Sequence, residues 1–176
     1  PIQSGDEEDG DRGRICKLLN LPKERWIPEV YKFKTPVSPH WAAEIENTVI
    51  QPELLKIPSD KKSLVVETAG GLMVPLNREW LQLEQLTKWK LPVILVARSG
   101  LGTINHTLLS LEAMRLRKIE VLGIVLNGIP HQDNPKTIEQ FGEIPVIAEL
   151  PKFPSISSQI LSNHWEEQKY NSAFQR

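Results

Sequence analysis

Hydrophobic residues along the chain gather in short runs, and stretches with helical spacing separate these runs. Each run is mostly Val, Ile and Leu and has the length of a buried β-strand. The runs occupy residues 63–66, 91–97, 119–126 and 145–148. The clearest helical spacing is that of Ile104, Leu108, Leu111 and Met114. Strands that alternate with amphipathic helices predict an α/β fold, in which helices cover both faces of a parallel sheet.

Capping and turn residues predict where the helices begin. Ser38 can cap a helix that runs to about residue 46, because Pro39 at its first position loses no needed N–H. Further starts are predicted at Asn77, at Thr103 or Asn105, and at Asn134-Pro135, and residues 12–19 form a short helix. Prolines in and just beyond residues 21–37 predict an extended connection. No repeat or low-complexity linker divides the chain, so we expect one α/β domain over residues 1–176.

The composition excludes several classes of protein. Lys and Arg number 21 and Asp and Glu number 22, so the net charge of −1 argues against binding to a nucleic-acid backbone. No apolar run approaches the roughly 20 residues that span a membrane, and the first residues do not form a signal peptide. Cys16 is the one cysteine, and a single cysteine suits the reducing cytoplasm. Cys16 and the four scattered histidines do not have the spacing of zinc ligands.

One predicted strand ends in residues suited to binding a cation or a phosphate. Ligands of parallel sheets bind at the edge where the carboxyl ends of the strands meet. Glu67 follows residues 63–66 and is placed to hold a hard cation, while the glycines of residues 67–71 let the backbone approach a phosphate. A glycine-rich turn with a solvated glutamate is the alternative. The acid-rich residues 6–11 indicate a solvated loop.

Two further strand ends carry candidate binding groups. Two glycines in residues 100–106 run into a helix start, where free N–H groups attract a carboxylate or a phosphate. A plain helix start capped by Thr103 is the alternative. Asn127 follows residues 119–126, and its amide can recognise the edge of a heterocycle through one donor and one acceptor. An ordinary Asx turn at Asn127-Gly128 stays open as well.

The order of these motifs resembles that of the dethiobiotin synthetase family. The matching segments are residues 1–5, 38–40, 66–76, 91–96, 100–109, 127–128 and 150–151. They cover nearly the whole chain, and the glycine-rich segment that ends in Asn105-His106 is a fairly specific part. The resemblance implies a P-loop NTPase-like fold.

The resemblance also implies an activity. That family closes the ureido ring of dethiobiotin from 7,8-diaminopelargonic acid, carbon dioxide and ATP, with Mg²⁺. The implied steps are carbamate formation on a substrate amine, phosphorylation of the carbamate by the γ-phosphate of ATP, and ring closure by the second amine. A cytoplasmic homodimer is expected, with no nucleic acid or membrane as a partner.

Site residues follow from the same resemblance. The substrate-binding residues would be Ser4 and, for the carboxylate of the diamine across a dimer interface, Gly102, Thr103 and Asn105. The metal ligands would be Asp11 and Glu67. The nucleotide site would comprise Asp11, Glu67, Thr68, Ala69, Gly70, Asn127, Gly128, Pro151, Lys152 and Phe153, with Asn127 reading the adenine.

The chain departs from the family pattern in four places. Thr68 stands where the family usually has Gly, residues 46–63 are short for the usual helix, and residues 155–158 lack an expected carboxylate near the ribose. The phosphate-binding loop G-x-x-x-x-G-K-[ST] does not occur in residues 1–176, and the catalytic lysine of the family would immediately precede Pro1. We therefore expect a longer polypeptide, and no turnover by these residues alone. The alternatives are a cobyrinate-type amide-forming synthetase and an inactive dimerising remnant of the fold.

Overall fold

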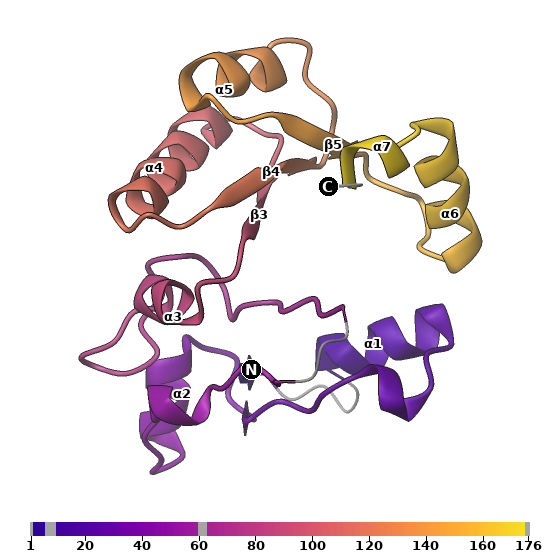
Figure 1. The fold of residues 1–176 in the computed structure, drawn as a ribbon. Coiled ribbons are helices and arrows are strands. Elements are labelled where there is room, and N and C mark those ends of the chain that lie inside the picture. Colours follow the sequence, from indigo (N-terminus) through magenta and orange to yellow (C-terminus); the bar gives the residue numbers. More distant parts are fainter. Residues whose placement is uncertain (1, 6–9, 60–62, 175–176) are drawn as a thin grey trace. The chain divides into compact units, whose positions relative to one another are not determined.

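The computed structural model describes residues 2–5, 10–59 and 63–174, which form two compact units, Pro1–Trp89 and Lys90–Arg176 (Figure 1). Each unit is described by itself. Most of the acid-rich run, residues 6–9, lies outside the described residues.

The first unit is built on a pair of short parallel strands. Its elements are β1 (Ile2–Ser4), α1 (Gly10–Leu19), η1 (Lys23–Arg25), β2 (Tyr31–Phe33), α2 (Pro39–Ile45), η2 (Pro52–Leu54) and α3 (Gln82–Trp89). In the β1–β2 pair, Ile2 lies opposite Tyr31 and Ser4 opposite Phe33. The core joins these strands to α2 and to the loops that follow it. It comprises Ile2, Phe33, Ala42, Ala43, Ile50, Leu55 and Leu76.

The helices predicted in this unit form, but their caps differ from the prediction. The helix α2 begins at Pro39 as expected, whereas the Ser38 side chain makes no capping hydrogen bond. Asn77 does not cap α3. Its amide instead donates to the Ile50 carbonyl at 3.0 Å and accepts from the Glu79 N–H at 2.9 Å, so it fixes the turn before the helix. The strand β2 lies inside the segment predicted to be only an extended connection.

The predicted buried strand at residues 63–66 is wrong. These residues adopt neither strand nor helix, and Val65 is 95% exposed. Leu64 is also exposed, at 43%. A strand exists only where its backbone N–H and C=O groups find partners on a neighbouring strand. The sequence pattern shows the apolar run but not whether that partner is present.

The second unit contains a three-stranded parallel sheet in the order β3-β4-β5. Its elements are β3 (Val93–Arg98), α4 (Thr103–Leu116), β4 (Val121–Asn127), α5 (Asn134–Gly142), β5 (Val146–Leu150), α6 (Ser158–Glu167) and α7 (Asn171–Phe174). The strands predicted at residues 91–97, 119–126 and 145–148 and the two helices between them are confirmed. Figure 1 shows α4 and α5 packed side by side along the sheet. The helices α6 and α7 were not predicted.

Burial in this sheet depends on the position of the strand. The middle strand β4 buries consecutive residues, with Ile124 and Leu126 at 0% and 1% exposure and Val125 at 7%. The edge strand β3 alternates instead, and Val96 is 62% exposed. The expected burial of residues 91–97 on both faces is therefore wrong for one face. A parallel sheet flanked by helices, as predicted, is nevertheless the architecture of this unit.

Candidate functional site

The carboxyl ends of the three strands of the second unit meet at one edge. Arg98, the last residue of β3, is in register with Asn127 at the end of β4, and Asn127 is in register with Leu150 at the end of β5. Each strand is followed directly by a loop that carries predicted site residues. The expectation that the segments after the strands at residues 91–97 and 119–126 share one edge is thus met within this unit. The third predicted strand end, at Glu67, belongs to the first unit and follows no strand.

Backbone geometry sets the start of α4. Gly102 occupies the N-cap position with φ of +89°, in the left-handed region that favours glycine. The next residue, Thr103, is 1% exposed, and its N–H donates to the Gly100 carbonyl at 3.1 Å. Its hydroxyl faces that of Thr107 at 3.5 Å, so Thr103 anchors the first turn rather than facing a ligand. Asn105 is exposed on that turn.

A basic side chain lies beside the same helix start. The Arg98 guanidinium is 3.3 Å from Nδ1 of His106, and a Cβ placed on Gly102 would lie 3.8 Å from Arg98 Nη2. The helix N-terminus and the guanidinium both favour an anion at this place. Arg98 was not among the predicted site residues, although its position as the last residue of a strand could have indicated it.

The loop after β4 holds Asn127 and Gly128 in a tight turn. Gly128 has φ of +136°, and its N–H donates to the Leu150 carbonyl at 2.8 Å. The Asn127 carbonyl accepts from the Ser99 N–H at 3.1 Å, which ties this turn to the end of β3. The Asn127 residue itself is exposed. Its backbone is therefore fixed while its side chain stays accessible, which is compatible with the predicted recognition of a base.

The loop after β5 carries the remaining predicted nucleotide residues. Pro151 is partly buried and Lys152 is exposed. The Phe153 ring lies edge-on to His164 of α6 at a centroid distance of 5.2 Å. His164 packs in the same way against Tyr170, whose hydroxyl donates to the Glu149 carbonyl of β5 at 2.7 Å. This chain of rings fixes the loop against the sheet.

In the first unit, two predicted residues line one open pocket of about 460 Å³. Ser4 ends β1, and Asp11 lies in the first turn of α1. The basic residues Arg14 and Lys34 line the same pocket, whose full lining is Gln3, Ser4, Gly5, Gly10, Asp11, Arg14, Lys34 and Pro36. The pocket thus combines a hydroxyl, a carboxylate and two cations, which suits a charged ligand. Arg14 and Lys34 were missed because neither follows a predicted strand end.

The segment with Glu67 is not part of any helix or strand. Glu67 is exposed, and the Thr68 hydroxyl donates to the Gly70 carbonyl at 3.3 Å. Ala69 packs against the core, and Gly70 has φ of +83° where a Cβ would approach Val74 to 3.2 Å. The predicted glycine-rich turn is therefore present, but the buried strand that was expected to precede it is not.

No cluster of three or more His, Cys, Asp or Glu side chains that could hold a metal occurs within the described residues. This finding does not conflict with a magnesium site, because Mg²⁺ is usually held by one or two carboxylates together with water and substrate phosphates. Asp11, in an open polar pocket, fits such a ligand. Glu67 offers a second carboxylate in the same unit.

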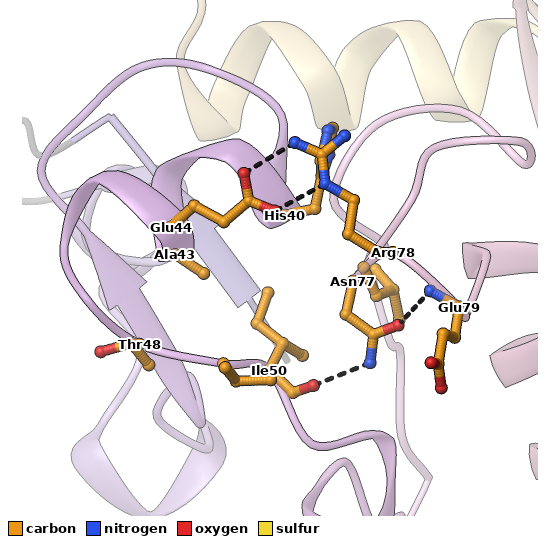
Figure 2. Close-up of a pocket in the computed structure, with 10 residues that line it drawn as sticks. His40, Ala43, Glu44, Thr48, Ile50, Asn77, Arg78 and Glu79 are labelled. Atoms are coloured by element: carbon orange, nitrogen blue, oxygen red, sulfur yellow. Dashed lines mark hydrogen bonds and ion pairs between the residues drawn. The ribbon is translucent and has the colours of Figure 1, made fainter.

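A second pocket, of about 280 Å³, contains none of the predicted site residues (Figure 2). Arg78 and Glu44 form a two-point ion pair across it, at 2.6 and 2.7 Å. The Arg78 hydrogen bond and charge lower the pKa of Glu44, which in turn raises the pKa of Arg78. Nδ1 of His40 is buried there without a hydrogen-bond partner among the described residues.

Comparison with known proteins decides the family. A family model described as an AAA domain matches residues 1–159. The chain is 44% identical over 161 residues to the ATP-dependent dethiobiotin synthetase BioD of Rhodopseudomonas palustris and 43% identical to that of Brucella ovis, with 92% of this chain and 76% of each relative covered. The chain belongs to the dethiobiotin synthetase family.

A longer relative gives the same result. The chain is 46% identical over 169 residues to the biotin biosynthesis bifunctional protein BioCD of Bordetella avium, with 96% of this chain and 36% of that protein covered. The resemblance read from the motifs is thereby confirmed, together with membership in a family of ATP-dependent ligases. No helix within the described part of the chain is long and apolar enough to cross a membrane.

Proposed function

We propose that the protein to which this chain belongs forms dethiobiotin from 7,8-diaminopelargonic acid, carbon dioxide and ATP. The observation that supports this most is the strand register, which brings Asn127 and the loop before α4 to one sheet edge in a chain 44% identical to a named synthetase. A substrate amine attacks carbon dioxide to give a carbamate. The carbamate oxygen takes the γ-phosphoryl group and ADP leaves, and the second amine then attacks the carbonyl carbon and expels phosphate.

The start of α4 binds the carboxylate of the diamine. The first N–H groups of a helix have no partner inside the helix, so they can donate to an anion. Gly102 leaves the approach open, and Asn105 is exposed on the same turn. Thr103 contributes by fixing the first turn, because its side chain is buried and its N–H donates to the Gly100 carbonyl at 3.1 Å. A homodimer, in which the partner copy completes this site, is part of the proposal.

The loops after β4 and β5 bind the adenine of ATP. The exposed amide of Asn127 supplies one donor and one acceptor to the edge of the base, and Gly128 gives the turn its shape. The backbone of residues 151–153 closes over the base, because the ring of Phe153 is held against α6. Pro151 and Lys152 belong to this closing segment.

The pocket of the first unit binds the reacting groups. Ser4 and Asp11 line this pocket, where Ser4 would donate to the substrate or carbamate. Asp11 would hold Mg²⁺ together with Glu67, an exposed carboxylate outside the lining of the pocket. When bound, Mg²⁺ supplies positive charge that neutralises the phosphate oxygens during transfer. The backbone of Thr68, Ala69 and Gly70 is assigned to the nucleotide-binding residues on the family resemblance. Arg14 and Lys34 add positive charge to the pocket that Ser4 and Asp11 line.

The phosphate-binding loop and the catalytic lysine of the family have no counterpart among these 176 residues. A single α/β domain over residues 1–176 is part of the proposal. The enzyme acts in the cytoplasm, where its nucleotide is abundant and its cysteine stays reduced.

The test is turnover by the purified full-length protein. We expect ADP release that depends on the diamine, with dethiobiotin detected by mass spectrometry. Asn127→Ala raises the KM for ATP roughly tenfold, since it removes two hydrogen bonds to the base. Asn163→Ala serves as the matched control, because Asn163 is exposed on α6 and its side-chain oxygen accepts from the Gln159 amide at 2.7 Å, away from the proposed base-binding loops. Absence of diamine-dependent ADP release would refute the proposed function.

A further inference from the structure

Ser99, directly after β3, bonds through all three of its polar groups to the end of β4, to the loop that follows it and to the first residue of α5. Its N–H donates to the Asn127 carbonyl at 3.1 Å, and its hydroxyl donates to the Ile129 carbonyl at 2.6 Å. Its own carbonyl accepts from the Asn134 side-chain amide at 3.0 Å. Ser99 is 5% exposed and Asn134 is 8% exposed, so water does not compete for these bonds.

The same residue sets the shape of the turn after Asn127. A Cβ placed on Gly128 would lie only 2.6 Å from Ser99 Oγ, so the hydroxyl occupies the space beside that glycine. The loop is closed at its far end by His131, whose Nδ1 accepts from the N–H groups of Asp133 and Asn134 at 3.2 Å each. Asn127 itself is exposed, so its side chain remains accessible to a ligand.

We propose that Ser99, supported by Asn134, is the positioning residue for adenine recognition. It does not touch the base. It holds the backbone of Asn127 and the turn at Gly128 so that the Asn127 amide is already oriented before ATP binds. A preorganised amide loses less freedom on binding than a mobile one, so the Ser99 hydroxyl contributes to nucleotide affinity and to the choice of base. This inference rests on the proposed function, which makes Asn127 the adenine-reading residue.

Ser99 acts on the nucleotide rather than on the diamine. The helix start proposed for the carboxylate is held by other bonds, from the Thr103 N–H to the Gly100 carbonyl and from the His106 N–H to the Gly102 carbonyl, both at 3.1 Å. None of these involves the Ser99 hydroxyl. Loss of that hydroxyl should therefore affect the two substrates unequally, whereas general damage to the unit would affect both.

The test measures ATP and GTP binding to the full-length protein by calorimetry, followed by KM values for ATP and the diamine. For Ser99→Ala we expect ATP binding and the ATP KM to weaken roughly fivefold, with the ATP-over-GTP preference reduced by a similar factor. The diamine KM and kcat stay within about twofold of the wild type. Ser99→Thr keeps the hydroxyl and restores most of the affinity.

Ser110→Ala is the matched control, because it also removes a serine hydroxyl that donates to a backbone carbonyl, that of His106 at 2.8 Å, but far along α4 from the loop. Equal ATP affinity in Ser99→Ala and Ser110→Ala would overturn the proposal, as would equal losses for both substrates. Asn134→Asp, which keeps the size of the side chain but removes its hydrogen-bond donor, is the second variant. If neither Ser99→Ala nor Asn134→Asp folded, the hydrogen bonds of Ser99 would have a structural role only, and the proposal would be overturned. A wild type that binds ATP but shows no diamine-dependent ADP release would refute the proposed function, while the binding comparison still tests Ser99.

Discussion

The packing between β4 and β5 offers a sharp test of the second unit. Gly123 lies on β4, and a Cβ built on it would approach the Ile147 side chain to 2.6 Å at Cγ2, 3.0 Å at Cδ1 and 3.1 Å at Cγ1. Contacts below 3.0 Å force the neighbour to move. Because Ile147 packs against the cluster of Val125, Ala148 and Tyr170, its movement disturbs the core of the sheet.

The size of the effect follows from two opposing contributions. Overpacking a filled core costs about 1–3 kcal/mol, whereas replacing glycine by alanine in a strand gains about 0.5–1 kcal/mol from the lower entropy of the unfolded chain. Gly123→Ala should therefore lower the free energy of unfolding by about 1 kcal/mol, and by no more than about 2.5 kcal/mol. Ile147 is only partly buried, so Ile147→Ala leaves a smaller cavity than at a core position and costs about 1–3 kcal/mol. In the double variant the new methyl group of residue 123 enters that cavity, so the two costs should not add.

Urea denaturation of the full-length protein and its variants measures these differences. We expect the double variant to be at least about 1 kcal/mol more stable than the sum of the two single changes predicts. A coupling energy of this size is usual for residues in contact. A Gly123→Ala protein as stable as the wild type would show that Ile147 moves aside without cost. Additive single changes would show that the two positions do not share space, and either result refutes the reasoning.

Three further outcomes are expected. Asp11→Asn keeps the size of the side chain but removes a carboxylate from the Ser4 pocket, so kcat/KM should fall by more than roughly tenfold and the Mg²⁺ requirement should rise; unchanged magnesium dependence would assign the metal to other residues. Burial by itself would raise the pKa of Glu29, but the Arg12 hydrogen bonds at 2.9 and 3.2 Å and the Arg12 charge outweigh burial and lower the pKa below 4.5. The stability that this pair contributes is therefore complete above about pH 4.5 and is lost as the pH falls through the lowered pKa, so the difference in unfolding free energy between the wild type and Glu29→Gln should shrink on acidification; a difference that grows there would contradict the assignment. Met114→Ala, at a fully buried position of α4, should cost about 2–5 kcal/mol in the same urea assay, whereas Leu116→Ala, at 73% exposure, should cost little.

The parts of the site that depend on local sequence could be predicted. Gly102 and the turn at Asn127-Gly128 were predictable, because a glycine between a strand and a helix indicates a backbone conformation that other residues disfavour. The bonds of Ser99 could not be predicted, because they join residues 28 to 35 positions apart and depend on the β3–β4 pairing. The same holds for Lys34, which reaches the Ser4 pocket only through the fold of the first unit.

Three apolar runs with similar composition show why strand prediction succeeded for the second unit and failed at residues 63–66. Each run contains a valine whose exposure can be compared, at 7% for Val125, 62% for Val96 and 95% for Val65. Within the described residues, β4 has a partner strand on each side, β3 has one, and the segment with Val65 has none. Exposure thus rises as partner strands are lost, although the local pattern is nearly the same. A run of apolar β-branched residues indicates that a segment fits a sheet. Whether the segment becomes a strand depends on hydrogen-bond partners from elsewhere in the chain.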